Sequence, residues 1–357
     1  MQRLHFTLTP KTAFATPLAG DTLFGQCCWA IRHILGEAKL NQLLAGYIDN
    51  KPFMVISDAM PQGFLLRPTL PTELLGFDTS DTKQRKAQKG KKWFPESVLT
   101  KPLNEWATLA KTEQEMVDTF LSDNEKKDNT SKNKKPRYLI NDEPQDHNSL
   151  NRLTGTTGTG EGFAPFQRQT FWYHPEIKLT LIIELDTERL SVADLLEALS
   201  WIGLHGYGKE ASCGLGKFEV RLFDKLTAHH ERLSINFEQT TPVRPEPVEG
   251  STVEGHNAWL TLAPCTPQGL SWHTQRCYYQ ILTRFGRHGD LAVHQSGGVF
   301  KNPVLMAATG AVLTPKEESN TQGFTGKGIT GVSKTITATV HQGYAPVYPV
   351  RLEVTND

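Results

Sequence analysis

The stretch GLHGYGKEASCGLGKFEV, residues 203–220, places five glycines between a helical pattern and a strand pattern. Glycine tolerates positive φ and has no side chain, so such a loop can bring backbone N–H groups against phosphate oxygens. Lys209, Ser212 and Lys217 add positive charge and a hydroxyl group. The loop follows a helix and lacks the GxxxxGK[ST] order, which disfavours an NTPase P-loop. The sequence therefore predicts a phosphate-contacting loop, with a purely structural turn as the alternative.

The segments around this loop predict a ferredoxin-like unit. Ser191 is placed to cap a helix whose apolar residues recur at helical spacing as far as Ile202. After the loop, Phe218, Val220 and Leu222 alternate as in a strand. The other expected elements are a strand around Leu4, Phe6 and Leu8, a helix over residues 23–35, short strands at Phe53–Ser57 and Phe64–Leu66, and a buried strand at Ile177–Leu185. Allowing for a large insertion in the middle, the order resembles β-α-β-β-α-β, which is typical of the ferredoxin-like fold.

The length of 357 residues suits two domains. We expect an α+β protein in which residues 1–238 form a ferredoxin-like domain and residues 258–357 form a second, smaller one. Residues 78–173 are too polar to continue the first sheet, so they should project as an insertion, and within them residues 123–137 should be disordered. The Pro/Glu/Gly-rich residues 239–257 indicate a linker or surface loop.

The charge of the chain is balanced but segregated. Lys+Arg and Asp+Glu each number 38, so the protein is not a polycation that would coat any nucleic acid. Residues 83–137 nevertheless hold 14 basic and 8 acidic side chains. No apolar run is long enough for a membrane span and the N-terminus lacks a signal-peptide pattern, which predicts a cytoplasmic protein. The five cysteines show no CxxC spacing, so we expect neither a disulfide framework nor a metal site.

The most basic segment lies inside the insertion. Six cations fall within ten residues, directly before Trp93 and Phe94. They are Lys83, Arg85, Lys86, Lys89, Lys91 and Lys92. Cations that follow phosphates, next to flat rings on which unpaired bases stack, are typical of single-stranded RNA sites. A solvated charge run beside a core anchor is the alternative.

Four collinear segments resemble one family of CRISPR proteins. The glycine-rich segment resembles the G-loop of the RAMP superfamily. FATPLAGDTLFGQCCWAIRHILGE (residues 14–37) resembles the "SDTLFGAL" opening of the fourth-subunit family of type III-A (Csm) effector complexes, with Gly20 where that family usually has serine. HNSLNRLTGTTGTGEGFAPFQRQTFWY (residues 147–173) is similar to its N-S-x-x-R-x-T-G segment, and GGVFKNPVLMAATGAVL (residues 297–313) to its C-terminal signature. The four segments span most of the chain, but the insertion and the linker are not covered.

The resemblance implies a non-catalytic subunit of an antiviral ribonucleoprotein, without a cofactor. Members of the family hold the 5′ repeat-derived tag of the crRNA, contact the large polymerase-like subunit and abut a backbone RAMP subunit. A thumb-like projection reaches the guide–target duplex near the tag boundary, and the insertion is the candidate for it. Besides the six cations, the candidate RNA-binding residues are Asn148, Arg152, Thr154, Arg168, His205, Gly206, Gly208, Lys209, Ser212, Gly214, Gly216 and Lys217.

Two other functions stay open at this point. Related RAMP proteins cleave guide precursors, which needs a positioned acid or base such as His33 or His205. The target-cleaving backbone subunits of type III complexes use an aspartate in a loop. Asp21 is the candidate within the opening segment, but there it is expected to cap the first helix. A general single-stranded RNA-binding module outside CRISPR systems is the other alternative, against which the four collinear segments argue.

Overall fold

The computed structural model describes residues 1–78, 80, 82–121, 137–157, 164–223, 256–267, 272–289, 298–316 and 323–353, with only the backbone of residues 82–84. The segment expected to be disordered and the expected linker lie almost entirely outside the described residues. Within them, helices and antiparallel sheets occur together, and the predicted α+β class is confirmed. None of the described helices has the length and apolar character needed to cross a membrane.

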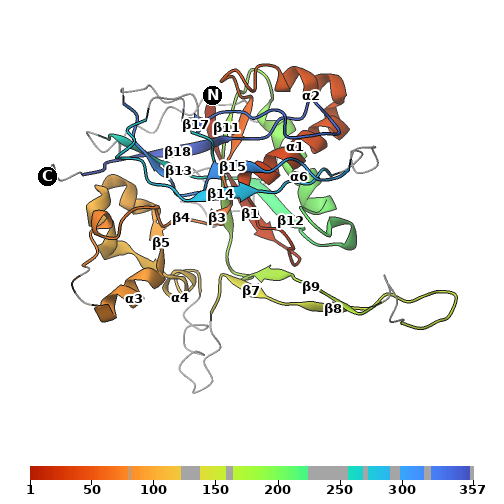
Figure 1. The fold of residues 1–357 in the computed structure, drawn as a ribbon, viewed down its shortest axis with the longest axis horizontal. Coiled ribbons are helices and arrows are strands. Elements are labelled where there is room, and N and C mark those ends of the chain that lie inside the picture. Colours follow the sequence, from red (N-terminus) through yellow and green to blue (C-terminus); the bar gives the residue numbers. More distant parts are fainter. Residues whose placement is uncertain are drawn as a thin grey trace, which may run out of the picture.

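The first sheet has the strand order β12-β1-β11-β2, with β3 also paired to β11. Its strands are β1 (Gln2–Pro10), β2 (Met54–Ile56), β3 (Met60–Pro61), β11 (Leu179–Leu185) and β12 (Phe218–Leu222). Leu4, Phe6 and Leu8 lie opposite apolar residues of β11 and are buried, as their alternation predicts. The helices α1 (Gly20–Leu35) and α6 (Val192–His205) cover one face of this sheet (Figure 1). The N-terminal part therefore has the predicted ferredoxin-like arrangement.

The two helices begin in different ways. Ser191 accepts a hydrogen bond from the Asp194 backbone at 3.1 Å and caps α6, as predicted. The expectation that Asp21 caps α1 is wrong, because α1 begins at Gly20 and Asp21 lies within its first turn. Asp58 receives the Gly20 N–H instead, at 2.8 Å. A Cβ at Gly20 would lie 2.3 Å from the Ile56 oxygen, so glycine permits the start of α1 to press against β2. A short helix, α2 (Glu37–Leu44), follows.

Residues 64–121 form a compact unit rather than a projection. They contain β4 (Phe64–Leu66), α3 (Thr82–Gly90), β5 (Lys91–Pro95), β6 (Lys111–Thr112), α4 (Glu113–Val117) and the 3₁₀ helices η1 (Glu73–Leu75), η2 (Glu96–Thr100) and η3 (Leu103–Leu109). The three strands pair in order β4-β5-β6. Phe94 and Trp106 are fully buried, with ring centroids 5.6 Å apart. The prediction that all of residues 78–173 projects is therefore wrong for 82–121, whose scattered apolar residues fill a core.

A narrow two-stranded extension does project from the body (Figure 1). We call it the arm; it comprises the described residues 137–157 and 164–173. Its strands are β7 (Ile140–Asp142), β8 (Gln145–His147), β9 (Phe166–Arg168) and β10 (Phe171–Tyr173). β7 pairs with β10, and β8 with β9. The thumb role implied by the resemblance stays a prediction.

The C-terminal half forms a second antiparallel sheet of order β16-β13-β18-β17 and a separate hairpin, β14-β15. Its strands are β13 (Ala258–Thr261), β14 (Ile281–Arg284), β15 (Val304–Ala307), β16 (Val312–Leu313), β17 (Phe324–Gly326) and β18 (Tyr344–Val350). Arg3 joins the two halves: it pairs with Glu184 and donates to the Val347 oxygen at 2.8 Å. No helix occurs in the described residues from 256 onward, so the helices of a second ferredoxin-like unit stay a prediction.

Candidate nucleic-acid interface

The glycine loop, residues 206–217, is held in one compact shape by its glycines. Gly206 and Gly216 have φ values of 101° and 74°, which other residues rarely adopt. A Cβ on Gly206 would lie 2.4 Å from the Leu215 oxygen, and one on Gly216 would lie 2.2 Å from the Tyr207 oxygen. Several N–H groups are used inside the protein, including that of Gly216, which donates to the Ala13 oxygen at 2.8 Å. The glycines therefore serve close packing within the protein. Any contact of the loop with a ligand depends on its outward-facing side chains.

The outward side chains of the loop are polar or basic. Lys209 and Ser212 are exposed and Lys217 is half-buried. The backbone N–H groups of Lys209 and Lys217 donate to the hydroxyl groups of Thr16 and Thr12, both at 2.9 Å. These two bonds fix the backbone from which each ammonium group extends. The loop can thus present two cations and a hydroxyl to a phosphate.

His205 is the last residue of α6 rather than part of the loop. Its Nδ1 lies 2.8 Å from the Trp201 oxygen, and its ring stacks on the Trp201 ring at 4.1 Å. The His33 ring also stacks on the Trp201 ring, with centroids 5.3 Å apart. Both histidines thus lie on the helical surface, in an aromatic stack.

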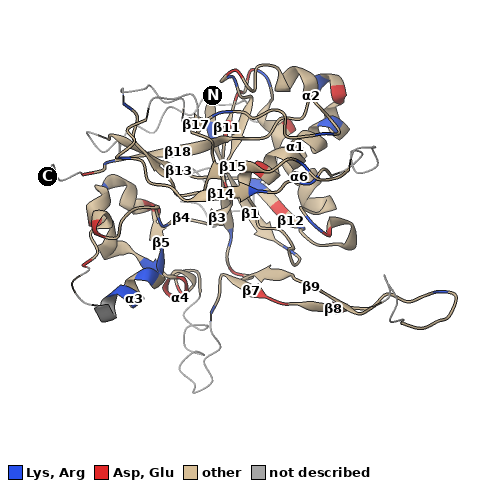
Figure 2. Ribbon diagram, in the orientation of Figure 1, with Lys and Arg blue, Asp and Glu red and all other residues tan. Residues whose placement is uncertain are grey.

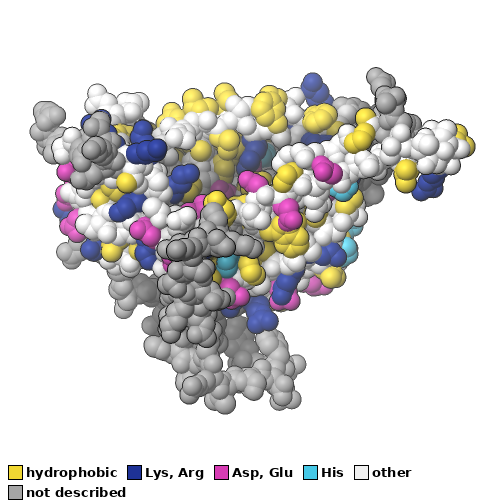
Figure 3. Space-filling model, turned by 90° about the horizontal axis from the view of Figure 1, so that it is seen from below, with side chains coloured by type: hydrophobic (Ala, Val, Ile, Leu, Met, Phe, Trp, Pro, Cys, Tyr) yellow, Lys and Arg dark blue, Asp and Glu magenta, His cyan; other side chains and the backbone are white. Residues whose placement is uncertain are grey.

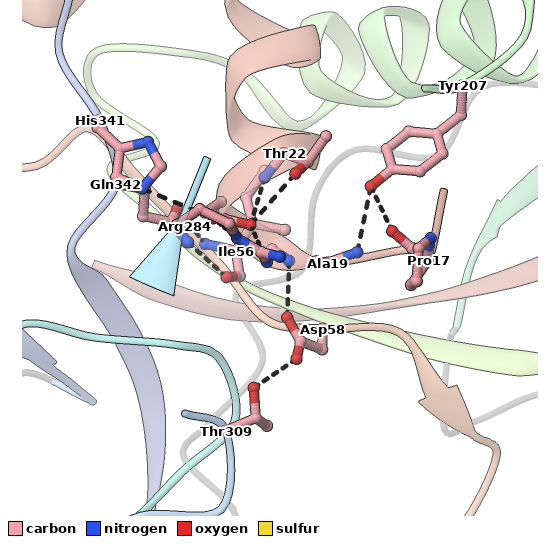
Figure 4. A network of polar contacts seen from close by, with 12 residues as sticks. Pro17, Ala19, Thr22, Ile56, Asp58, Tyr207, Arg284, Thr309, His341 and Gln342 are labelled. Atoms are coloured by element: carbon pink, nitrogen blue, oxygen red, sulfur yellow. Dashed lines mark hydrogen bonds and ion pairs between the residues drawn. The ribbon is translucent and has the colours of Figure 1, made fainter. Parts of the chain in front are cut away.

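Tyr207 anchors the loop to the segment before α1 (Figure 4). Its hydroxyl group donates to the Pro17 oxygen at 2.7 Å and accepts from the Ala19 N–H at 3.2 Å. The ring is fully buried, and burial raises the pKa of its hydroxyl well above the ordinary value. The loop and the start of α1 therefore form one rigid unit.

The same unit is joined to the C-terminal half by two carboxylates, that of the buried Asp21 and that of the half-buried Asp58, and Figure 4 shows Asp58 beside Thr309. Arg284, at the end of β14, donates to both oxygens of Asp21, and Thr309 donates to Asp58. Burial raises the pKa of Asp58 to about 6, although bonds from Thr309 and Gly20 oppose this increase. His341 lies 3.6 Å from Asp21, and burial lowers its pKa to about 4.

The side chain of Gln342 also joins the two halves. The strand order makes β2 an edge of the first sheet, where N–H and C=O groups need partners. The fully buried Gln342 amide accepts from the Ile56 N–H at 2.9 Å and donates to the Ile56 oxygen at 2.7 Å. One side chain thereby completes this part of the edge.

The NSLNR segment lies at the outer end of the arm. Asn148, Arg152 and Thr154 are exposed there. Asn151 closes a tight turn, because its side chain accepts from the Leu153 N–H at 2.9 Å. The Thr154 hydroxyl pairs with that of Thr156 at 2.9 Å. Polar side chains therefore hold the turn, and the Arg152 guanidinium extends into solvent.

One ion pair connects the arm to the glycine loop. Arg168 on β9 lies 3.2 Å from the Glu210 carboxylate, and its guanidinium covers the Phe166 ring at 5.5 Å. Glu210 has a φ of 65°, a left-handed conformation for a non-glycine residue. Arg168, predicted to bind RNA, thus has its charge paired within the protein. Gly208 and Gly214, also predicted to bind RNA, lie on either side of Glu210 in the chain.

The basic segment lies apart from the loop and arm. Figure 2 shows Lys and Arg gathered on α3 and the start of β5. Arg85, Lys86, Lys89 and Lys92 are exposed and Lys91 is half-buried, whereas the side chain of Lys83 lies outside the described atoms. Phe94 is buried in the core, so it cannot stack on a base. The aromatic part of this predicted patch is therefore wrong for Phe94, while its cations remain accessible.

The charges elsewhere are mixed. Seen from below, Lys and Arg lie scattered among hydrophobic and acidic side chains on the described part of the surface (Figure 3). Sequence patterns missed Tyr207, Asp58, Arg284 and Gln342, because each acts through a contact distant in the chain. The GYG motif was the one available signal for Tyr207, as an aromatic residue between two glycines. In the described part of the chain, no three His, Cys, Asp or Glu side chains gather as metal ligands.

Comparison with known proteins gives structural similarity only. No family model matches the sequence, and no curated protein is significantly similar to it. A chain in the crystal structure of the Csm3–Csm4 subcomplex of the type III-A CRISPR–Cas interference complex is 13% identical, with a TM-score of 0.56, over 98% of this chain and 99% of that one. Chains in the Csm1–Csm4 cassette with AMPPNP and with cA4 are each 13% identical over the full length of both chains, with TM-scores of 0.51 and 0.50. At this identity, the shared feature is the fold.

Proposed function

We propose that this chain is the Csm4-type subunit of a cytoplasmic type III-A CRISPR effector complex and that it holds the 5′ tag of the crRNA without cleaving it. One observation carries the proposal. The chain matches, over nearly its full length, chains from both a Csm3–Csm4 and a Csm1–Csm4 structure, and Csm4 is the subunit common to both names. The four collinear sequence segments support the same subunit.

The partners follow from that assignment. A Csm4-type subunit would bridge the large polymerase-like subunit to the first backbone RAMP subunit, as the two subcomplexes suggest. The arm is the candidate for the projection that reaches the guide–target duplex near the tag boundary.

The proposed RNA contacts are side chains on the glycine loop and at the end of the arm. Lys209, Ser212 and Lys217 would contact tag phosphates, with their backbone positions fixed by Tyr207 and the two threonine hydroxyls. Arg152 would contact RNA farther out along the arm. Such cations bind a strand through charge and hydrogen bonds and need no positioned acid or base, which suits binding rather than cleavage.

Co-purification tests the proposal. The tagged chain is expressed with its Csm1-like and Csm3-like partners and a guide locus, and the recovered RNA is sequenced. We expect guide RNAs with a uniform 5′ tag. Mixed cellular RNA would support a general RNA-binding module instead.

Single substitutions then test the contacts. Arg152→Ala and Lys209→Ala should each weaken RNA binding and lower the salt-dependence slope by about 0.7, the loss of one phosphate contact on a single strand. The exposed Lys51, far from the loop in the chain, serves as the matched control as Lys51→Ala. Unchanged affinity and slope in both test variants would contradict the site.

Incubation with guide precursor tests the absence of catalysis. We expect no cleavage by the purified chain. Cleavage that disappears in His205→Ala would identify an endoribonuclease and overturn the non-catalytic assignment.

A further inference from the structure

From Ile281 to His288, the segment that contains β14 exposes every second residue. Tyr279, Ile281 and Phe285 are 49%, 73% and 75% exposed, whereas Arg284 and His288 point inward. Arg284 reaches Asp21, and the buried His288 lies 2.6 Å from the Ser333 hydroxyl. The inner face of this strand is therefore fixed to the body, while its outer face presents large apolar side chains to solvent.

The neighbouring chain segment widens this outer face. Thr283 lies opposite Leu305, and Arg287 lies opposite Phe300. Leu305 and Phe300 are 68% and 67% exposed. The Arg287 guanidinium covers the Phe300 ring, 5.3 Å from its centroid. We call this surface the outer face of the hairpin, and Figure 1 shows β14 and β15 side by side across the middle of the molecule. Contiguous exposed apolar side chains of this kind mark a binding surface.

The two described segments that carry this outer face bear charges of one sign. The described residues 272–289 and 298–316 contain five Lys or Arg and no Asp or Glu. The five are Arg276, Arg284, Arg287, Lys301 and Lys316. Of these, Arg284 is neutralised by a buried carboxylate, that of Asp21. In a chain with no net charge, this concentration of cations favours a polyanionic ligand.

A cavity continues the surface at its Tyr279 end. It has a volume of about 660 Å³ and its lining includes Arg67, Lys92, Tyr278, Tyr279 and Gln280. Arg67 is fixed there, because it donates to the Gln88 oxygen at 2.8 Å and lies over the Phe77 ring. No carboxylate lines this cavity in the described part of the chain. Two cations and two tyrosines thus continue the combination of positive charge and aromatic rings beyond the strand.

We propose that the outer face of the hairpin is a second contact surface for an unpaired RNA strand, with bases stacked on Phe285 and Phe300 and a phosphate at Arg287. Exposed rings on a sheet that carries cations are what single-stranded RNA requires, since each base has a flat face and each linkage a negative charge. The choice of ligand rests on the proposed function. The surface is distinct from the glycine loop and the arm, and none of its residues belongs to the RNA-binding set predicted from sequence.

Binding by the purified full chain tests the inference. The affinity for a fluorescein-labelled oligouridine is measured by fluorescence anisotropy for the wild type and for the double variant Phe285→Ala/Phe300→Ala. We expect the double variant to bind about thirtyfold more weakly or worse, the loss of two stacked bases. Arg287→Gln should lower the salt slope by about 0.7. Ile48→Ala, which shortens an exposed apolar side chain elsewhere, should leave the affinity unchanged.

The outcomes separate this inference from the proposed function. Unchanged affinity in the double variant, with Lys209→Ala still defective, overturns the inference and leaves the proposed function standing. If the double variant keeps its RNA affinity but loses a co-purifying subunit, the surface binds protein and the inference is wrong. In the assembled complex, 4-thiouridine placed in the guide tag or in the target identifies the strand that cross-links to Phe285 or Phe300. Cross-linking of neither strand overturns the inference as well.

Discussion

The carboxylate of Asp21 and the guanidinium of Arg284 form a two-pronged ion pair across 263 positions of the chain, with N–O distances of 2.5 and 2.7 Å. Asp21 belongs to the first turn of α1, and Arg284 ends β14. The Asp21 side chain is 1% exposed, and besides this guanidinium its carboxylate accepts from the Thr22 N–H at 2.8 Å. The pair therefore connects the ferredoxin-like sheet, the glycine-loop unit and the C-terminal hairpin.

Loss of this pair should destabilise the whole chain. Arg284→Met leaves a buried carboxylate unpaired, which costs about 3–5 kcal/mol of the free energy of unfolding. The double variant Asp21→Asn/Arg284→Met removes the orphaned charge and should recover part of that loss. Urea unfolding measures the free energy of unfolding of both variants. Arg287→Met, an exposed arginine three residues away, should change stability by less than about 0.5 kcal/mol; an equal loss in the two single variants would contradict a special role for Arg284.

The elements that sequence patterns predicted correctly are those with a local cause. The alternation of Leu4, Phe6 and Leu8 depends only on the two faces of one strand, and the Ser191 cap depends only on the residue three positions later. The positive φ of the loop glycines also has a local cause, because it is a property of single residues, whereas the phosphate contact of the loop stays a prediction. Such features are visible in a short window of sequence.

The features that were missed depend on partners distant in the chain. In residues 82–121 the apolar residues do not recur at strand or helix spacing. Phe94 and Trp106 nevertheless pack against each other, although 3₁₀ helices separate them in the chain. Gln342 completes the edge of β2 from 286 positions away. Asp21 has the sequence context of a helix cap, but the fold supplies Asp58 for the Gly20 N–H and leaves Asp21 for Arg284. No local pattern could separate these two carboxylates.

Asp58 should make stability depend on pH in a defined direction. Its pKa rises from the ordinary 3.8 to about 6 in the folded chain, so the folded state holds the proton more tightly than the unfolded state. The stabilisation from this group is complete below pH 3.8 and is lost as the pH rises through 6. Relative to Asp58→Asn, the wild type should therefore lose about 1–3 kcal/mol between pH 4 and pH 7, because a tenfold difference in proton affinity corresponds to about 1.4 kcal/mol.

Urea unfolding of both proteins across this pH range measures the difference. His341, whose pKa is lowered to about 4 by burial, opposes the trend, because its stabilisation is lost as the pH falls from 6.5 toward 4. Since both proteins contain His341, its contribution largely cancels in the comparison. A difference that stays constant with pH would show that Asp58 ionises equally in the folded and unfolded chains.

Two glycines of the same loop should respond differently to alanine. Gly216 has a φ of 74°, and a Cβ would lie 2.2 Å from the Tyr207 oxygen and 2.6 Å from its nitrogen. Gly214 has a φ of 89° with no atom within 4 Å of its Cβ position. Gly216→Ala should therefore cost about 3 kcal/mol or more, whereas Gly214→Ala should cost only the left-handed strain of about 1–2 kcal/mol. Thermal unfolding compares the two, and equal losses would contradict steric contact as the reason for glycine at 216.

The Arg168–Glu210 pair should restrain the arm against the glycine loop. Both side chains are partly exposed, at 26% and 20%, so a double-mutant cycle with Arg168→Ala and Glu210→Ala should give a coupling of only about 0.5–1 kcal/mol. The clearer readout is local: amide hydrogen exchange in β8 and β9 should become faster in either variant, because the arm loses its attachment near residue 168. Arg152→Ala, at the outer end of the arm, serves as the control and should leave that exchange unchanged.

If Glu210→Ala also strengthens RNA binding, the freed Arg168 guanidinium can contact phosphate, as the sequence predicted for it. Exchange in β8 and β9 that is the same in all four proteins would mean that the strand pairing alone holds the arm in place.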